Sequence, residues 1–305
     1  MKRIVLTGPT GAIGIALIRQ CIREGVEAYA LIRRNSRRRE RIPGHEAVHV
    51  VECDLEELDR LDAAAIPPCD VFYHLGWAGT TGDSRNDMRL QLDNVRYTLD
   101  AAAAASRLGC RVFVGAGSQA EYGRAEGVLQ ASTPAFPETG YGMAKLCAGQ
   151  MSRRECGRLG IRHIWTRILS VYGPYDSESS MVMSSIRKIL AGETPLFTKG
   201  EQMWDYLYCE DAARALFLLG ESGKDQKIYC IGSGAADRLA NYIRIIGEQT
   251  DPQVPLGIGQ VPYGENKVMY LCADIRQLQE DTGFRPRFSF EEGIRKTVEW
   301  AKAEV

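Results

Sequence analysis

A glycine-rich loop close to the N-terminus constrains the fold of this chain more than any other feature. Arg3–Thr7 has the apolar pattern of a short buried strand, and a helix is expected over residues 12–24, ended by Gly25. The residues that join them are Gly8, Pro9, Thr10, Gly11, Ala12, Ile13 and Gly14. Glycines at such a junction allow a tight turn and let the backbone approach a pyrophosphate, whose charge the helix N-terminus stabilises. The order of strand, loop and helix therefore predicts a dinucleotide-binding site, against the alternative that the glycines only form a turn.

Strand-like and helical segments then alternate over the first 170 residues. Further strands are expected at 28–32, 48–53, Val71–His74, 112–114 and 161–168, and helices at 87–108 and 141–159. This alternation predicts an α/β protein with a Rossmann-type, doubly wound parallel sheet in residues 1–170. Residues 171–305 are less regular and richer in proline, so we expect a smaller C-terminal substrate-binding lobe there. Segments near 204–232 are expected to return to the dinucleotide-binding domain.

Composition excludes several classes of protein. The chain has 38 Lys and Arg against 39 Asp and Glu, which argues against binding to nucleic acid or to an anionic membrane. No apolar run approaches the ~20 residues that a membrane span needs. The nine cysteines are scattered without a CxxC pair, as expected for reduced thiols in a cytoplasmic protein. The four histidines are too far apart to predict a metal site.

The end of the second expected strand bears on the choice of dinucleotide. An acidic residue there would bind the adenosine ribose and favour NAD, but the chain has Arg33 and Arg34. Guanidinium groups can form charge-assisted hydrogen bonds with a 2′-phosphate, so NADP(H) is favoured and NAD(H) remains possible. The arginines from Arg37 onward are interpreted as a solvated basic loop. Asp54, after the third strand, can accept from the adenine amino group or cap a helix.

Tyr141 and Lys145 are four residues apart, on one face of an expected helix. A nearby cation lowers the pKa of a phenol and makes it a usable general acid and base. Ser118 follows the strand at 112–114, and the carboxyl end of a parallel strand faces the crevice where ligands bind. A second pair with the same spacing, Tyr263 and Lys267, lies in a loop after Pro262, and we interpret it as chance.

In these features the chain resembles the extended short-chain dehydrogenases/reductases, in the branch that acts on nucleotide sugars. The motifs that carry the resemblance occur in family order: the glycine loop, Tyr73-His74-Leu75-Gly76, GSQAEYG at 117–123, YGMAK at 141–145, RILSVYGP at 167–174 and WDYLYCED at 204–211. The resemblance implies that Tyr141 is the acid/base, that Lys145 lowers its pKa and binds the nicotinamide ribose, and that Ser118 orients the substrate oxygen.

The resemblance also implies a cofactor site. Its expected residues are Gly8, Thr10, Gly11, Ala12, Ile13, Gly14, Arg33, Arg34, Asp54, Leu55, Leu75, Gly76, Tyr141 and Lys145. Asn94 matches a helix asparagine of the family, and a hydrogen bond between two helices is an equal alternative for it. The helices at 87–108 and 141–159 resemble a pair that forms a dimer interface in the family, so a homodimer is expected.

The residues after Ser118 narrow the reaction. The family's 4,6-dehydratases carry an Asp-Glu pair where this chain has Gln119 and Ala120, neither of which can titrate. Epimerase-reductases of the GDP-fucose synthase type carry a cysteine where Ala120 stands, and Glu121 is expected to point away. Two reactions remain: NADPH-dependent reduction at C4 of a nucleotide-linked 4-keto-6-deoxyhexose, which the arginines favour, and NAD-dependent 4-epimerisation. A non-catalytic dinucleotide sensor is a third alternative, which the presence of Tyr141 and Lys145 disfavours.

Substrate contacts are expected from Ser118 and Gln119 and from the C-terminal lobe. Arg187 and Arg214 could pair with a diphosphate, although helix arginines are often only solvated. Trp204 could stack on a base, although aromatic residues of strands are usually core residues. The expected partner is a nucleotide-sugar substrate, with neither nucleic acid nor membrane.

Overall fold

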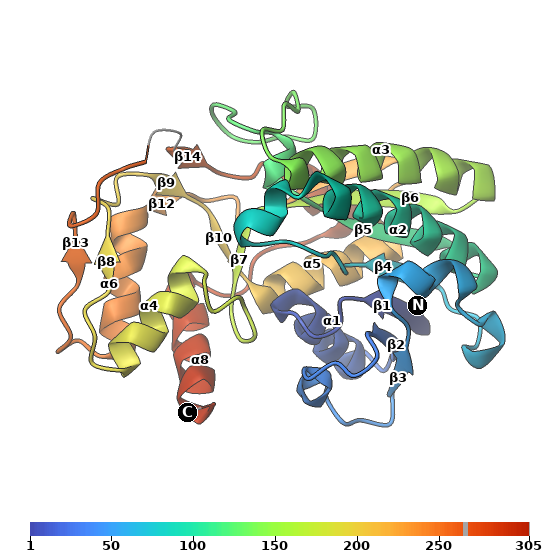
Figure 1. Cartoon of the computed structure of the whole chain (residues 1–305), viewed down its shortest axis with the longest axis horizontal. Coiled ribbons are helices and arrows are strands. Elements are labelled where there is room, and N and C mark those ends of the chain that lie inside the picture. The colour runs from blue at the N-terminus through green and yellow to red at the C-terminus, as the bar shows by residue number, and fades with distance from the viewer. Residues whose placement is uncertain (265–267, 305) are drawn as a thin grey trace.

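A seven-stranded parallel sheet forms the centre of the computed structural model, which describes residues 1–264 and 268–304 (Figure 1). The spatial order of the strands is β11-β6-β5-β4-β1-β2-β3. Their bounds are β1 (Arg3–Thr7), β2 (Glu27–Ile32), β3 (Val48–Glu52), β4 (Val71–His74), β5 (Val112–Ser118), β6 (Arg162–Ile168) and β11 (Lys227–Ile231). The order reverses between β1 and β4, and ligands of such sheets bind where the loops after these strands separate.

Helices cover both faces of the sheet, which confirms the predicted Rossmann-type α/β fold. The helices α1 (Ala12–Arg23) and α5 (Cys209–Ser222) pack together on one face, and α2 (Met88–Arg107) and α3 (Gly140–Leu159) pack on the other. Residues of β1 alternate between the two layers, since Ile4 and Leu6 belong to the core cluster with α1 and α5 and Val5 to the cluster with α2. This double burial explains why the strand sequences are apolar throughout.

The helix ends lie close to those predicted because capping residues mark them. Asp87 accepts hydrogen bonds from two backbone N–H groups at the start of α2, and Thr139 does so at the start of α3. At the other ends, Gly109 and Gly160 adopt positive φ angles of 72° and 70°. Local chemistry thus defines both helices that face the candidate site.

Strand β5 is longer than predicted. The expected strand covered only 112–114, but β5 runs to Ser118 through Gly115 and Gly117. A Cβ atom at Gly115 would lie 2.4 Å from the Trp165 ring, and one at Gly117 would lie 2.2 Å from the Glu121 carboxylate. The glycines therefore allow close packing of neighbouring side chains, where the sequence had indicated a loop.

The C-terminal part of the chain forms a smaller group of helices and short strands beside the sheet (Figure 1). Its helices are α4 (Met181–Leu190), α6 (Leu239–Thr250), α7 (Arg276–Thr282) and α8 (Phe290–Ala303), of which α4 and α7 were not predicted from the sequence. Its paired strands are β7 (Ser170–Tyr172) with β10 (Tyr206–Tyr208), β8 (Leu196–Phe197) with β13 (Gly257–Ile258), and β9 (Met203–Trp204) with β12 (Asp237–Arg238) and β14 (Tyr270–Leu271).

Several 3-10 turns complete the chain: η1 (Arg39–Arg41), η2 (Leu55–Arg60), η3 (Ala63–Ala65), η4 (Gly82–Asn86) and η5 (Gln119–Glu121). Within the described ranges, no helix combines the length and apolar character that crossing a bilayer requires. The same ranges contain no cluster of His, Cys, Asp and Glu suited to a metal ion. All nine cysteines are free thiols, and Cys147 alone among them is exposed.

Candidate active site

The glycine loop between β1 and α1 leaves its backbone accessible where a ligand would approach. Gly8 has a φ angle of 69°, and a Cβ atom on it would lie 2.8 Å from the backbone N of Gly76 in the loop after β4. A Cβ atom on Gly14 would lie 2.3 Å from the Gly8 carbonyl oxygen. Gly11 is the N-cap of α1, and neither a capping side chain nor an acidic residue occupies that end. The first N–H groups of α1 are therefore available to an anion.

A cavity of about 460 Å³ lies in front of this loop. It is lined by the ends of β1, β2 and β4 and the loops that follow them: Thr7, Gly8, Pro9, Thr10, Gly11, Leu31, Ile32, Arg33, Ser36, Arg38, Cys53, Leu55, Leu75, Gly76, Trp77, Ala78 and Gly79. Of the expected cofactor residues, Ala12, Ile13 and Gly14 form the start of α1 just behind this lining. The free helix N-terminus and the glycine cradle suit the pyrophosphate of a dinucleotide.

Two of the expected cofactor residues are held away from the cavity. The Arg34 guanidinium forms an ion pair with Glu57 at 3.1 Å, and the Arg34 backbone N–H donates to the Asp54 carboxylate at 2.9 Å. Asp54 is the N-cap of η2 and forms a capping box with Glu57. Arg34 is thus absent from the cavity lining, and Asp54 performs the capping role that was its alternative. Arg38, which we had interpreted as solvated, lines the cavity instead.

Ser118 and Tyr141 meet where β5 ends and α3 begins. Ser118 is the last residue of β5, and Tyr141 lies in the first turn of α3. A hydrogen bond from Ser118 lowers the pKa of the Tyr141 phenol, but burial outweighs it and raises the pKa above its usual value. The phenol is therefore protonated at neutral pH and can serve as a proton donor.

Lys145 lies one turn further along α3 and is buried. Its Nζ donates to the Ala116 carbonyl oxygen at 2.5 Å and lies 3.6 Å from the centre of the Trp77 ring. The centre of the Tyr141 ring is 5.8 Å from the same Nζ. Burial lowers the pKa of Lys145 to about 7, so its charge is not fixed at neutral pH. The structure thus brings Ser118, Tyr141 and Lys145 together. Lys267 of the second spacing match lies outside the described residues.

Side chains of α2 hold the loop after β4. Asn94 accepts from the Ala78 backbone N–H at 2.8 Å and donates to the Ala78 carbonyl at 2.9 Å, so it binds this loop and does not bridge two helices. Gln91 accepts from the Trp77 indole N–H at 2.9 Å. Trp77 therefore presents its face to Lys145 in a fixed orientation. The sequence offered no signal for this role beyond the position of Trp77 after a strand.

A buried ion pair supports the end of β5. The Glu121 carboxylate accepts from the Ser118 backbone N–H at 2.8 Å, from the Trp165 indole at 3.0 Å and from the Arg167 guanidinium at 2.8 Å. The side chains of Glu121 and Arg167 are 1% and 3% exposed. Glu121 therefore faces the protein interior, where it fixes the backbone of Ser118.

A second cavity, of about 190 Å³, adjoins the start of α3. Its lining includes Gln119 and Ala120 after Ser118, Thr139 before Tyr141, and Tyr270 of β14. Because this lining joins residues adjacent in sequence to Ser118 and Tyr141 with residues of the C-terminal part of the chain, and also includes Arg85, the cavity offers space for a substrate group. Gln119 is the expected substrate residue that lies on this cavity.

The other expected substrate residues are held by neighbouring groups. Arg187 pairs with Glu178 at 3.2 Å and donates to the Ala301 carbonyl at 3.0 Å, so it connects α4 to the end of α8. Arg214 is buried on α5 and donates to the Arg285 carbonyl. Because both guanidinium groups already have partners within the protein, we leave Arg187 and Arg214 out of the proposed substrate site.

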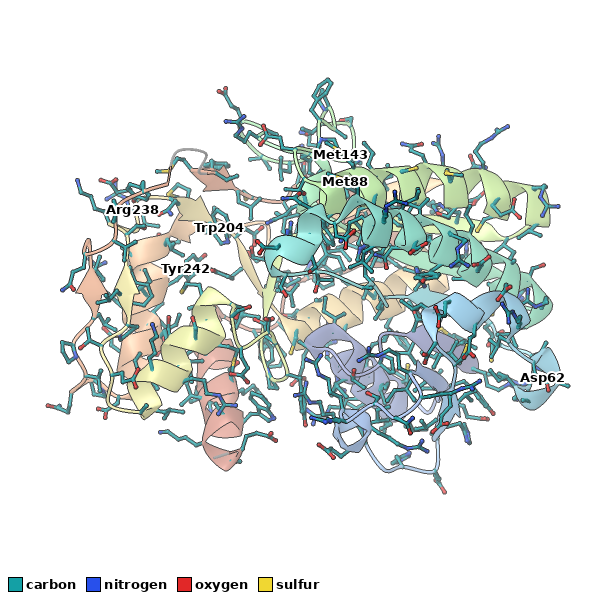
Figure 2. The ribbon with its side chains drawn as sticks, viewed as in Figure 1. Asp62, Met88, Met143, Trp204, Arg238 and Tyr242 are labelled. Atoms are coloured by element: carbon teal, nitrogen blue, oxygen red, sulfur yellow. The ribbon has the colours of Figure 1, made fainter. Side chains whose placement is uncertain are left out.

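Trp204 lies on β9 in the C-terminal part of the chain (Figure 2). Its indole N–H donates to the Ser170 hydroxyl at 2.8 Å, and the ring is half-buried. The indole bond connects β9 to β7, so this contact orients the ring. Part of the ring therefore remains available for stacking on a base.

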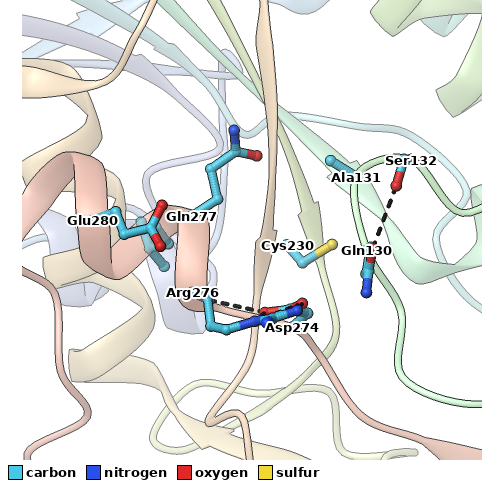
Figure 3. Close-up of a pocket in the computed structure, with 9 residues that line it drawn as sticks. Gln130, Ala131, Ser132, Cys230, Asp274, Arg276, Gln277 and Glu280 are labelled. Carbon is cyan, nitrogen blue, oxygen red and sulfur yellow. Dashed lines mark hydrogen bonds and ion pairs between the residues drawn. The ribbon is translucent and has the colours of Figure 1, made fainter.

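A third cavity, of about 400 Å³, lies beside the edge strand β11 (Figure 3). Its arginine, Arg276, is paired with Asp274 at 2.5 Å, and burial raises the pKa of the Cys230 thiol to about 11. None of the expected site residues lines it. Because Arg276 and Asp274 are paired with each other and none of the expected site residues is present, this cavity is a poorer candidate for a reaction site.

The sequence of the chain is similar to those of known proteins. Residues 4–232 match the NAD dependent epimerase/dehydratase family. The dTDP-glucose 4,6-dehydratase of Shigella flexneri is 30% identical over 183 residues, which cover 57% of this chain and 50% of that enzyme. The chain thus matches only half the length of that relative. The enzyme of the same description from Neisseria meningitidis serogroup B is 26% identical over 98% of this chain and 93% of its own length.

Solved structures share the whole fold. A UDP-N-acetylglucosamine 4-epimerase from Methanobrevibacter ruminantium M1, in complex with UDP-N-acetylmuramic acid, superposes with a TM-score of 0.89 at 22% identity and covers 100% of this chain and 99% of its own. MoeE5 in complex with UDP-glucuronic acid and NAD has a TM-score of 0.84 at 25% identity, with 99% of each chain covered.

Proposed function

This chain belongs to the NAD dependent epimerase/dehydratase family, and from that premise we propose that it is an NADPH-dependent reductase. Its proposed substrate is a nucleotide-linked 4-keto-6-deoxyhexose, reduced at C4. The observation that carries the proposal is the pair Arg33 and Arg38, which line the cofactor cavity together with Ser36 at the end of β2. Two guanidinium groups and a hydroxyl suit a 2′-phosphate, and net reduction in cells generally draws on NADPH.

Ser118, Tyr141 and Lys145, at the carboxyl edge of the sheet, each have a separate role in the proposed proton transfer. When bound, NADPH would supply the hydride that reduces C4. Tyr141 donates its phenolic proton to the ketone oxygen as that oxygen gains negative charge, and Ser118 donates a hydrogen bond to the same oxygen. Lys145 can exchange a proton near neutral pH, because burial lowers its pKa to about 7. It therefore supports reprotonation of Tyr141 after each turnover.

Dehydration is disfavoured for this chain, although the curated relatives named above are dehydratases. Gln119 and Ala120 follow Ser118, and neither side chain can take up a proton. Glu121, the nearest carboxylate in the sequence, is buried against Arg167 and faces the interior. The elimination of water needs an acid and a base beside C5 and C6 of the sugar, and the turn after Ser118 supplies neither.

A 4-epimerase is the second candidate. Ser118, Tyr141 and Lys145 also suffice for this reaction, in which Tyr141 takes the proton of a C4 hydroxyl and later returns it. The full-length similarity to a protein described as a 4-epimerase favours this alternative. It would require a retained NAD, which the cations of the cofactor cavity do not favour.

One assay separates the two candidates. The purified protein is incubated with NADPH or NADH and a panel of nucleotide-linked 4-keto-6-deoxyhexoses, and the near-UV absorbance of the reduced nicotinamide is followed. Stoichiometric loss of NADPH with one sugar is expected. Inversion at C4 of an ordinary nucleotide sugar without cofactor consumption, and with NAD retained, would instead indicate an epimerase. Tyr141→Phe should lower turnover at least about a hundredfold while cofactor affinity stays close to wild type, and Tyr97→Phe is the matched control.

We also propose a homodimer that forms through α2 and α3. Large apolar side chains are exposed on the outer surface of these helices: Met88 is 57%, Leu92 67%, Met143 47% and Met151 45% exposed. Met88 lies beside the start of α3, close to Met143 (Figure 2). Met88 and Leu92 are four residues apart on α2, and Met143 and Met151 are eight apart on α3, so each pair lies on one side of its helix. Such apolar surfaces on two packed helices suit the pairing of identical surfaces about a twofold axis.

A further inference from the structure

A second cation lies against the catalytic tyrosine, and no sequence motif had identified it. Arg85 belongs to η4, between β4 and α2, and its guanidinium carbon is 4.3 Å from the centre of the Tyr141 ring. Its Nη1 donates to the Thr80 carbonyl at 3.0 Å, which fixes the guanidinium. The neighbouring Asn86 side chain accepts from the Gly140 backbone N–H at 3.1 Å. The turn that carries Arg85 is therefore attached to the start of α3.

Four polar or charged groups on four elements surround the Tyr141 phenol. Arg85 of η4 contacts the ring, Lys145 follows on α3 with its Nζ 5.8 Å from the ring centre, and the Ser118 hydroxyl of β5 and the Glu121 carboxylate of η5 both influence the pKa of the phenol. Ser118 and Arg85 lower the pKa of Tyr141, whereas burial and the charge of Glu121 raise it. Lys145 is directed to Trp77 and the Ala116 carbonyl.

The two cations differ in how firmly they hold their charge. Burial lowers the pKa of Lys145 to about 7, so the ammonium is only partly charged at neutral pH. A guanidinium keeps its charge at every pH at which proteins are folded, and the Arg85 side chain is half-buried. An arginine stacked on a phenol ring is a favourable contact that becomes stronger when the phenol ionises.

We propose that Arg85 is the fixed cation of this site and stabilises the phenolate of Tyr141 by its contact with the ring. Arg85 also lines the second cavity, but the role proposed here acts through Tyr141, so it is the role of a positioning residue. The inference rests on the proposed function only in naming Tyr141 as the group that transfers the proton. The two cations then have different roles: Arg85 supplies a constant positive charge, and Lys145 supplies a proton that can be transferred.

The test is a titration of Tyr141 in the full chain without substrate. Protein labelled with carbon-13 at the phenolic carbon of tyrosine is followed by NMR against pH, and the Tyr141 resonance is assigned by its loss in Tyr141→Phe. Arg85→Gln should raise the pKa of Tyr141 by about one unit or more, the low end of what an opposite charge at this range produces. Arg89→Gln, an exposed charge on the next turn, should leave it unchanged.

Arg85→Lys keeps the charge and guards against a folding defect in the neutral variant. Its phenol pKa should lie between those of wild type and Arg85→Gln, because an ammonium makes a weaker contact with the ring. An unchanged pKa of Tyr141 in a folded Arg85→Gln protein would overturn the inference. So would a change of equal size in Arg89→Gln.

The pH dependence of turnover then separates this inference from the proposed function. With an active substrate, the limb of the pH profile that reports Tyr141 should move in Arg85→Gln in the same direction as the NMR titration. If no nucleotide sugar reacts but the phenol pKa still rises in Arg85→Gln, the proposed function fails and the role of Arg85 stands. If a sugar is reduced and the profile of Arg85→Gln matches wild type, the role of Arg85 fails and the function stands.

Discussion

Lys145, a proposed catalytic residue, lowers the stability of the fold when its buried side chain is charged. Its ammonium is buried against Trp77 and the Ala116 carbonyl, and burial lowers its pKa from 10.5 to about 7. Below about pH 7 the folded protein bears the full desolvation cost of the charge, whereas the unfolded chain keeps its lysine solvated. As the pH rises from about 7 towards 10.5, the folded lysine is neutral while the unfolded one still binds a proton. The contribution of this group to the free energy of unfolding therefore rises over that interval.

Lys145→Met should consequently be more stable than wild type at about pH 6, and this gain should shrink by about pH 9. Urea unfolding at the two pH values measures the free energy of unfolding of both proteins. The substitution removes the buried charge but leaves the Ala116 carbonyl without its donor, which offsets about 1 to 3 kcal/mol of the gain at both pH values. The difference between the two pH values is thus the informative quantity. A gain that is equal at both would contradict the lowered pKa.

The expected preference for NADPH over NADH rests on two arginines that follow β2, Arg33 and Arg38. Arg33→Ala combined with Arg38→Ala should weaken NADPH binding at least about 100-fold more than NADH binding, since each of the two lost hydrogen bonds to a charged group is worth about 1.5 to 3 kcal/mol. Arg34→Ala should change neither affinity much, because Arg34 is paired with Glu57. Fluorescence titration with both cofactors measures these affinities. Equal weakening of NADPH and NADH binding in the double variant would rule out recognition of a 2′-phosphate.

The sequence could not show whether Arg34 or Arg38 lines the cofactor cavity. The end of β2 could be predicted, but the turn that follows it could not. In this turn Asn35 has a φ angle of 54°, and the Ser36 N–H donates to the Arg33 carbonyl. This reversal brings Arg38 back to the cavity and leaves Arg34 outside. Similarly, Arg85 and Trp77 meet Tyr141 and Lys145 only through the packing of separate segments, and no spacing in the sequence encodes that contact.

At the scale of elements, the end of β5 depends on a buried ion pair. Glu121 of η5 fixes the Ser118 backbone and neutralises Arg167 of β6, and both side chains are almost fully buried. Glu121→Gln would leave the Arg167 charge uncompensated in the interior. We expect a loss of about 3 to 5 kcal/mol in the free energy of unfolding, measured by urea denaturation.

A double variant tests the cause of that loss. In Glu121→Gln with Arg167→Met, the unpaired charge is gone, so a large part of the stability should return. If the double variant is as unstable as Glu121→Gln alone, the loss comes from the hydrogen bonds to Ser118 and Trp165 and not from the charge of Arg167.

The same region explains which elements the sequence could predict. Helices α2 and α3 begin at capping residues and end before glycines, which are local signals, and their predicted bounds were accurate to about one residue. Strand β5 was predicted too short because Gly115 and Gly117 are typical of loops. Their real function is to leave space for the Trp165 ring and the Glu121 carboxylate, which come from elsewhere in the chain. Structure that is determined within one segment could thus be predicted, whereas structure that depends on packing against another segment could not.

For the whole molecule, the outer layer of α2 and α3 links the candidate site to assembly. Both helices cover one face of the sheet, and α3 also carries Tyr141 and Lys145 (Figure 1). Leu92, at 67%, is the most exposed apolar side chain of the two helices, and Met151 on α3 is 45% exposed. Exposed apolar side chains gathered on one helical surface mark an interaction site in a soluble protein. A dimer through this layer would also restrain the helix that positions the proton donor.

This arrangement predicts a dimer that charge can dissociate. Light scattering during size-exclusion chromatography should give twice the mass of one chain for wild type. Leu92→Glu with Met151→Glu should give the mass of a single chain, because paired helices would bring identical carboxylates together in an apolar interface. Leu196→Glu is the matched control, since Leu196 is 52% exposed on β8 in the C-terminal part and should leave the dimer intact. A monomeric wild type, or equal dissociation by Leu196→Glu, would show that α2 and α3 do not form the interface.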